Sequence, residues 1–207
     1  MFRLRRRPSP HMPFVFVIGF NKTGTTSLHE FFCRNGFPSI HWDHGRLARR
    51  MVMNCLNDRR ILDGYDQRYR VFSDMVTQTR SLRLEANAFF RILDRDYPGS
   101  FFLYNTRPVA DWIRSRSAKT FGRYGGCTNL ELEMHVLNTS DPQRAIDTWT
   151  RERDDHARSV RDYFAGRGNF LDIDITDPAV PARLAEWLDI KLDPRHWQRI
   201  VTNRRAA

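Results

Sequence analysis

The stretch "VIGFNKTGTTSLHEFF", residues 17–32, decides the fold. Gly19 and Gly24 lie five positions apart, as in the phosphate-binding loop G-x-x-x-x-G-K-[ST]. Thr25 stands where that loop has its lysine, and the lysine, Lys22, precedes the second glycine. The stretch therefore predicts a related anion-binding loop whose anion differs from the usual one.

The segment around this loop has the composition of an anion site. An apolar strand, a glycine loop and a helix bring several backbone N–H groups and the positive end of the helix dipole to one point. Lys22 adds a full positive charge. Four hydroxyl side chains add hydrogen-bond donors: Thr23, Thr25, Thr26 and Ser27. A plain strand–turn–helix in which Thr25 only caps the helix is the alternative, and the density of donors around Gly24 argues against it.

Length and composition indicate one domain. The chain has 207 residues, of which 41% are hydrophobic, and this is enough for one full core. No apolar run approaches the roughly 20 residues that span a bilayer. The basic start "MFRLRRRPSP" is interrupted by prolines, so residues 1–13 are predicted to be a disordered arm instead of an export signal. Residues 14–207 are predicted to form the domain.

Charge and cysteine content indicate which partners, cross-links and compartment to expect. The net charge of +10 favours acidic partners, but the basic residues are spread along the whole chain. Cys33, Cys55 and Cys127 are odd in number and form no CxxC pair, so neither a disulfide framework nor a zinc site is predicted. A reduced, cytoplasmic protein is the expectation. Nothing in the sequence specifies an oligomeric state.

The hydrophobic pattern alternates between strands and helices. The predicted strands are 14–20, 39–42, 70–75, 100–107 and 169–175. The predicted helices are 25–35, 45–60, 80–96, a segment opened by Pro108, 141–166 and 177–190. Residues 117–140 are polar and contain glycines, which predicts a mobile loop or lid. The alternation predicts an α/β fold: a three-layer, P-loop-type parallel sheet covered by helices on both faces.

The position of Lys22 in the loop indicates which transferred group the loop can hold. Nucleoside triphosphate enzymes use the lysine after the second glycine for the terminal phosphates, and a carboxylate at another strand end for Mg²⁺. Here no lysine follows Gly24, and Asp172 and Asp174 alternate within their strand instead of ending it. No metal is expected. A less charged transferring group, such as a sulfuryl group, fits the loop better.

Two motifs carry a family resemblance. "KTGTTSL" after an apolar strand resembles the 5′-phosphosulfate loop of the sulfotransferases that use 3′-phosphoadenosine-5′-phosphosulfate (PAPS). That family also has an arginine at a later strand end and a serine eight residues on. In "LYNTRPVADWIRSR", Arg107 and Ser115 have this spacing. Residues 148–177 resemble the helix and strand that follow in bacterial members, and the likeness covers about 14–190.

The resemblance implies roles for these residues. The chain would move a sulfuryl group from PAPS to a hydroxyl acceptor, which could be a carbohydrate, a lipid or a small phenol. Lys22 would neutralise the bridging oxygen as the phosphate leaves, and Arg107 with Ser115 would hold the 3′-phosphate. The loop would hold the 5′-phosphosulfate through Lys22, Thr23, Gly24, Thr25, Thr26 and Ser27. The animal cytosolic enzymes close on the 3′-phosphate with Arg-Lys-Gly, and here only Arg204-Arg205 near the end is comparable.

Transfer to a hydroxyl needs a base near the acceptor proton. In "SIHWDHG", His41, Asp43 and His44 follow the second predicted strand and should face the same crevice. We expect His41 to be the base with Asp43 as its orienting partner, and His44 is the competitor. Glu30 and Asp74 are the next candidates.

Two rival functions remain at the level of the sequence. A nucleotide or small-molecule kinase with a degenerate loop would require Mg²⁺. A basic phosphate- or nucleic-acid-binding module would have a clustered basic face and salt-sensitive binding. Because the charge is evenly spread and there is one anion loop, no nucleic-acid partner is expected.

Overall fold

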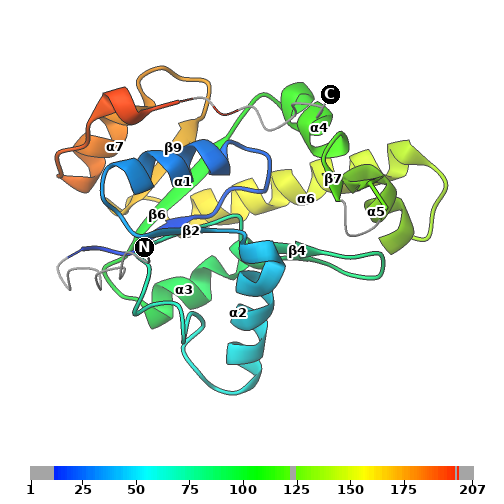
Figure 1. Cartoon of the computed structure of the whole chain (residues 1–207), viewed down its shortest axis with the longest axis horizontal. Coiled ribbons are helices and arrows are strands. Elements are labelled where there is room, and N and C mark those ends of the chain that lie inside the picture. The colour runs from blue at the N-terminus through cyan, green and yellow to red at the C-terminus, as the bar shows by residue number, and fades with distance from the viewer. Residues whose placement is uncertain (1–11, 122–124, 199, 201–207) are drawn as a thin grey trace, which may run out of the picture.

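A five-stranded parallel sheet forms the centre of the protein, whose computed structural model describes residues 12–121, 125–198 and 200 (Figure 1). The strands run in the order β2-β3-β1-β6-β9. Their bounds are β1 Val15–Val17, β2 Ser39–His41, β3 Val71–Ser73, β6 Phe101–Thr106 and β9 Phe170–Asp174. The predicted arm lies outside the described residues, apart from Met12 and Pro13.

Helices cover both faces of this sheet, which confirms the predicted three-layer α/β fold (Figure 1). One face carries α1 (Thr25–Arg34) and α7 (Val180–Leu188). The other carries α2 (Arg46–Leu56), α3 (Phe90–Asp96) and α6 (Pro142–Tyr163). The remaining helices are α4 Val109–Ser117, α5 Asn129–Val136, and the 3-10 turns η1 Asp43–Gly45, η2 Ala86–Phe89 and η4 Pro194–His196.

Strand β1 and the residue after it show why the strands of the central sheet are continuous apolar runs in the sequence. Val15 and Val17 pack under α1 and α7, whereas Phe16 and Ile18 pack on the side of α2, α3 and α6. All four side chains are fully buried. Because successive side chains of a strand point to opposite faces, a strand covered on both sides must be apolar at every position.

The predicted helix over 80–96 is partly wrong. Its first part belongs to an antiparallel hairpin of β4 (Val76–Gln78) and β5 (Arg83–Glu85), and helix α3 begins only at Phe90. The Thr79 hydroxyl accepts hydrogen bonds from the backbone N–H groups of Ser81 and Leu82 at the turn. Tertiary ion pairs override the local helical pattern here, since Arg83 binds Glu133 of α5 at 2.8 Å.

The predicted loop over 117–140 is also more ordered than expected. It contains a second hairpin, β7 (Thr120–Phe121) with β8 (Cys127–Thr128), followed by α5. Thr128 and Glu131 form a capping box that starts α5, because each side chain bonds the backbone N–H of the other. The glycines at 125 and 126 lie in the turn between the two strands.

The carboxyl ends of all five strands meet at one edge of the sheet, where parallel α/β proteins bind ligands. Gly24 ends the first loop at this edge with φ of +89° and starts α1. A Cβ atom added at Gly24 would lie 2.2 Å from Ile175 Cγ1. Glycine is therefore needed here for both its backbone conformation and its lack of a side chain.

We expect Gly24→Ala to destabilise the fold by about 2 to 4 kcal/mol, since it adds left-handed strain and a core clash. Gly166→Ala is the matched control: Gly166 has φ of +75° but no heavy atom within 4 Å of an added Cβ. It should lose only about 1 kcal/mol. Urea unfolding of both variants measures the difference, and equal losses would show that the contact with Ile175 is relaxed.

Candidate active site

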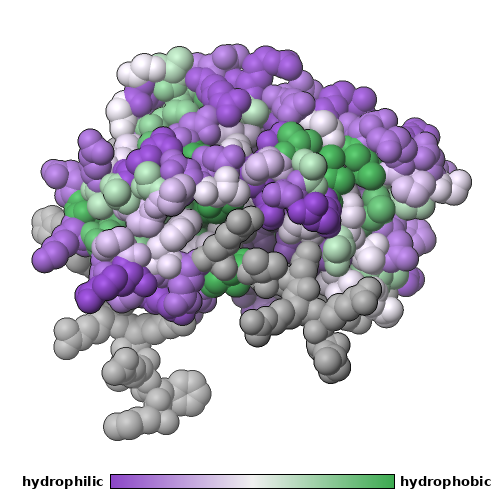
Figure 2. Space-filling model, turned by 90° about the horizontal axis from the view of Figure 1, so that it is seen from above, coloured by the Kyte–Doolittle hydropathy of each residue, from purple (hydrophilic) through white to green (hydrophobic). Residues whose placement is uncertain are grey.

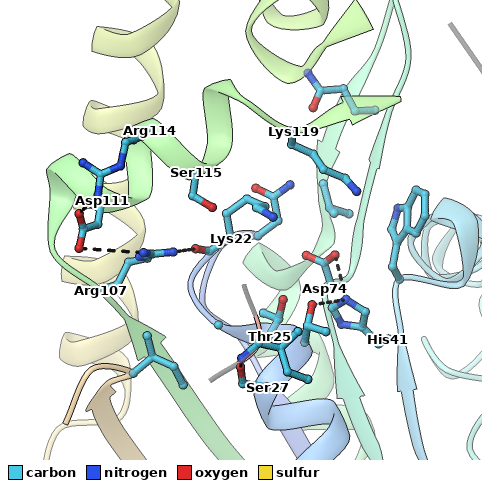
Figure 3. A pocket seen from close by; sticks show the side chains of 18 of the residues that line it. Lys22, Thr25, Ser27, His41, Asp74, Arg107, Asp111, Arg114, Ser115 and Lys119 are labelled. Atoms are coloured by element: carbon cyan, nitrogen blue, oxygen red, sulfur yellow. Dashed lines mark hydrogen bonds and ion pairs between the residues drawn. The ribbon is translucent and has the colours of Figure 1, made fainter. Parts of the chain in front are cut away.

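A cavity of about 360 Å³ lies at the carboxyl edge of the sheet (Figure 3). Most of its lining falls into three sets, which we name by their position. The loop end consists of Lys22, Gly24, Thr25, Thr26 and Ser27, the opposite wall consists of Arg107, Asp111, Arg114 and Ser115, and the aromatic end consists of His41, Trp42, Asp74, Val76, Gln78, Lys119 and Phe121. Every strand of the sheet contributes its carboxyl end or the segment that follows it, because Ile175 after β9 also lines the cavity.

The side-chain amide of Asn105 holds the loop end in shape. Asn105 lies on β6 and is fully buried. Its Oδ1 accepts from the Gly19 N–H at 3.1 Å, and its Nδ2 donates to the Thr23 carbonyl at 2.9 Å and to Thr23 Oγ1 at 2.7 Å. One residue thus binds both sides of the loop. The close approach requires Gly19, since an added Cβ would lie 2.1 Å from the Asn105 carbonyl oxygen.

A second buried side chain fixes the middle of the loop. Arg116 of α4 is fully buried, donates to Asn21 Oδ1 at 2.5 Å and forms an ion pair with Glu85 at 2.6 Å. Its guanidinium lies 4.7 Å from the centroid of the Trp149 ring. Trp112, also on α4, donates its indole N–H to the Asn21 carbonyl at 3.0 Å. Helix α4 and the loop are therefore packed against each other through buried hydrogen bonds.

The hydroxyl groups of the loop do not all face the cavity. Thr25, Thr26 and Ser27 line it, and Ser27 Oγ accepts from the Ile200 N–H at 2.9 Å. Thr23 differs from the sequence expectation: its hydroxyl bonds Phe20 O and Asn105 inside the fold, and Thr23 is not among the lining residues. Its side chain shapes the loop.

Arg107 and Ser115 face the loop from the other wall. Arg107 follows β6, and its Nη1 donates to the Lys22 carbonyl at 3.3 Å. It also lies 4.0 Å from Asp111, which pairs with Arg114 (Figure 3). Ser115 lies on α4 and lines the same cavity. The two halves of the predicted motif are thus brought together across one space.

Lys22, Asp74 and His41 form the electrostatic centre of the cavity (Figure 3). Burial lowers the pKa of Lys22 to about 8, assisted by the charge of Lys119 and opposed by Asp74. Burial also lowers the pKa of His41 to about 4, and the positive charges of Lys22 and Lys119 act in the same direction. His41 is therefore neutral at pH 7.

Asp74 has the opposite shift. Burial raises its pKa to about 7, repulsion by Glu85 adds to this, and Lys22 and Lys119 oppose it. Asp74 Oδ2 lies 3.6 Å from His41 Nε2, and Oδ1 is buried with no hydrogen-bond partner in the described part of the chain. A carboxylate with an unsatisfied oxygen next to the loop lysine is suited to accept a proton from a ligand.

The remaining candidates of the histidine segment lie elsewhere. Asp43 was expected to orient His41, but it pairs with Arg46 at 2.8 Å and accepts from the Tyr65 hydroxyl at 2.7 Å. The Nδ1 atom of His41 instead contacts Ser73 Oγ at 3.1 Å. His44 is exposed and packs near the Trp42 ring. Neither Asp43 nor His44 lines the cavity, because a left-handed turn at 42–44 carries the chain away from it.

The sequence analysis did not identify several residues of the site, although some of them can be recognised from their position in the sequence. Asn105 is a polar residue inside the apolar run "FFLYNT", and such a residue must find a buried partner. Glu30 pairs with Arg34 on α1 and does not line the cavity, so proximity to the loop in sequence misleads there. Gln78 lies on the β4–β5 hairpin and Lys119 directly precedes β7 of the other hairpin, and local patterns predicted neither hairpin.

The described residues hold no cluster of three His, Cys, Asp or Glu side chains that could bind a metal ion. Within the described part of the chain, none of the helices is long and apolar enough to cross a membrane. The face seen in Figure 2 is mostly hydrophilic, with small separate hydrophobic areas.

Comparison with known proteins identifies the family of the chain. A family model described as "Sulfotransferase domain" matches residues 14–177, which include the loop, Asp74, Arg107 and Ser115. No curated protein matches the chain. Because the family match covers well over half of the sequence, the chain belongs to the sulfotransferase domain family. Its class of activity is sulfotransfer, and it is a transferase.

The raised pKa of Asp74 makes a prediction for stability. An aspartate in an unfolded chain has a pKa near 3.9, so the folded protein holds this proton more tightly than the unfolded chain. The free energy of unfolding should therefore fall as the pH rises from about 4 to about 7, and stay low above pH 7, where Asp74 is ionised in the folded protein. Below about pH 4 Asp74 is protonated in both the folded and the unfolded state, so it should have no such effect. We expect Asp74→Asn to be more stable than wild type by roughly 1 to 3 kcal/mol at pH 8 and equal to it at pH 4.

Urea unfolding at pH 4, 6 and 8 measures this difference. Val76→Ala, two residues from Asp74 and buried but without a charge, is the control and should change stability equally at all three pH values. A constant difference between Asp74→Asn and wild type across the range would contradict the shift.

Proposed function

We propose that the protein transfers a sulfuryl group from PAPS to a hydroxyl acceptor. One observation carries the proposal: the loop after β1 and the Arg107–Ser115 pair, 80 or more residues apart in the chain, line a single cavity. PAPS carries two separated anionic groups, the 5′-phosphosulfate and the 3′-phosphate. Two separate anion-binding walls facing one space suit such a molecule.

The loop end would hold the 5′-phosphosulfate. Its backbone N–H groups lie at the start of α1, where the helix dipole is positive, and Thr25, Thr26 and Ser27 supply hydroxyl donors. Lys22 is held over this space and is still mostly protonated at pH 7, because its pKa is about 8. It would stabilise the negative charge that develops on the leaving phosphate oxygen.

The opposite wall would hold the 3′-phosphate. Arg107 supplies a planar guanidinium and Ser115 a hydroxyl donor. The animal enzymes close this site with Arg-Lys-Gly, which the chain lacks. Here the C-terminal segment reaches the loop end itself, since Ile200 lines the cavity and its N–H binds Ser27. Arg204 and Arg205 lie outside the described residues.

Asp74 would be the general base, with neutral His41 beside it. A group with a pKa near 7 takes protons at neutral pH and still drives their transfer, whereas a histidine with a pKa of about 4 is a weak base. The acceptor hydroxyl would give its proton to Asp74 as its oxygen bonds to sulfur. The sulfur–oxygen bond to the 5′-phosphate breaks, and the leaving phosphate takes the electron pair.

Adenosine 3′,5′-bisphosphate should bind and stabilise the wild-type protein without metal, by about 2.7 kcal/mol at a hundred times its dissociation constant. Arg107→Ala should weaken this binding at least tenfold, because a charged hydrogen bond to phosphate is lost. It should leave binding of adenosine 5′-phosphosulfate unchanged, since that molecule has no 3′-phosphate. Calorimetric titration of both ligands measures this.

The exposed Arg114, which also lines the cavity, is the matched control, and Arg114→Ala should weaken binding less. ATP with Mg²⁺ is titrated as a competing ligand. If ATP with Mg²⁺ binds more tightly than adenosine 3′,5′-bisphosphate, the kinase alternative is favoured and the proposal is contradicted.

The pKa values of the centre predict a bell-shaped pH profile of kcat/KM. Activity should rise through a pKa near 7 as Asp74 loses its proton, and fall through a pKa near 8 as Lys22 loses its own. Asp74→Asn should lose the acidic limb and roughly 10²- to 10⁴-fold in turnover while keeping affinity for adenosine 3′,5′-bisphosphate. His41→Ala should keep the acidic limb. If His41→Ala loses that limb and Asp74→Asn retains it, the base is His41.

A further inference from the structure

The aromatic end of the cavity has a distinct chemistry from the loop end. Trp42 after β2 and Phe121 of β7 meet edge to face, with ring centroids 6.4 Å apart and planes at 63°. Val76 of β4 lines the same end and is 4% exposed. Three segments that are far apart in the sequence thus build an apolar corner beside Asp74 and Lys22.

The backbone at Trp42 is strained, and this strain sets where the ring lies. Trp42 has φ of +59°, a conformation that is unfavourable for a large side chain. Lys22 and Asp74, which line the same cavity, also have positive φ. Strained residues persist where the surrounding structure holds them, and they gather at ligand sites. Three of them around one cavity indicate that the Trp42 ring is placed there for a ligand.

Gln78 adds one polar contact to the apolar corner. Its side chain is 9% exposed, and its Nε2 donates to Glu133 at 3.5 Å. Its Oε1 is buried and has no hydrogen-bond partner in the described part of the chain. A buried carbonyl oxygen without a partner is costly, and a ligand hydroxyl that donates to it removes the cost. Gln78 therefore adds an acceptor group beside the apolar corner of Trp42, Phe121 and Val76, in addition to Asp74 and His41.

We propose that the acceptor is a planar aromatic compound that carries two hydroxyl groups, one that reacts at Asp74 and one that donates to Gln78. This inference rests on the proposed function and names its substrate class. An aromatic ring can pack against the corner that Trp42 and Phe121 form together, where its faces need no hydrogen bonds. The proton of the reacting hydroxyl goes to Asp74, as described above.

The other acceptor classes match this corner less well. A sugar carries hydroxyl groups around its whole ring, and the faces of Trp42, Phe121 and Val76 offer them no hydrogen-bond partners. A long-chain alcohol needs an extended apolar channel. Here the charged side chains of Lys119 and Asp74 lie next to the rings, so the apolar surface is short.

Four acceptors test the inference in sulfate transfer from PAPS: 4-hydroxybenzyl alcohol, 4-ethylphenol, methyl glucoside and dodecanol. The first two have nearly the same shape, but only 4-hydroxybenzyl alcohol has a second hydroxyl group. We expect it to be the best of the four, with kcat/KM about tenfold above 4-ethylphenol, the factor of one net hydrogen bond. Gln78→Leu should lower kcat/KM for 4-hydroxybenzyl alcohol to the level of 4-ethylphenol and so abolish this preference.

Trp42→Gly removes the ring and accepts the positive φ without strain, so the turn is retained. It should lower kcat/KM for both phenols at least roughly tenfold and leave the Kd of adenosine 3′,5′-bisphosphate unchanged. Leu82→Ala, exposed at the tip of the β4–β5 hairpin and outside the cavity, is the control and should change neither.

The outcomes separate this inference from the proposed function. If adenosine 3′,5′-bisphosphate binds but the glucoside or dodecanol is the best acceptor, or none of the four is sulfated, the acceptor class is wrong and the donor assignment stands. If the two phenols react equally in wild type, the role of Gln78 is wrong. If adenosine 3′,5′-bisphosphate does not bind wild type, the proposed function itself fails.

Discussion

The buried amide of Asn105 is the constraint on which the rest of the site depends. It binds Gly19 on one side of the loop and Thr23 on the other, and so ties the loop after β1 to the neighbouring strand β6. Arg107 follows Asn105 by two residues and comes directly after the same strand. The separation between the loop end and Arg107 is therefore set by the pairing of β1 with β6. A molecule with two anionic groups at a fixed separation needs such a frame.

Burial then adjusts the charges inside this frame in opposite directions. The same loss of water lowers the pKa of Lys22 to about 8 and raises that of Asp74 to about 7. Each group is thus near its point of proton exchange at physiological pH, as acid–base chemistry requires. Arg116 joins α4 to the loop through its hydrogen bond to Asn21, and to the β4–β5 hairpin through its buried ion pair with Glu85. The site is consequently a network that joins the loop, the hairpin and α4.

The local sequence predicted the structure correctly where a single physical rule determines the local conformation. Phe16 and its neighbours had to be strand because they are apolar at every position and buried on both faces. The glycine loop and the Arg107–Ser115 spacing predicted the two walls of the cavity. The sequence was a poor guide where distant partners decide. Arg83 and Glu85 fit a helical pattern, but their partners on α4 and α5 hold them in a hairpin.

The choice of general base shows that local sequence is also insufficient within the site. "SIHWDHG" suggested that His41 and Asp43 act together, but the left-handed turn at Trp42 separates them, and Asp43 binds Arg46 and Tyr65 instead. Asp74 reaches His41 only because β2 and β3 are neighbours in the sheet. Strand order is a property of the whole chain, and no local pattern contains it.

The most direct test of the central claim is a crystal structure of the protein with adenosine 3′,5′-bisphosphate. We expect the 5′-phosphate to lie against the backbone N–H groups at the start of α1, beside Lys22. We expect the 3′-phosphate to lie between Arg107 and Ser115. A 3′-phosphate directed to solvent, or a nucleotide bound outside this cavity, would contradict the account.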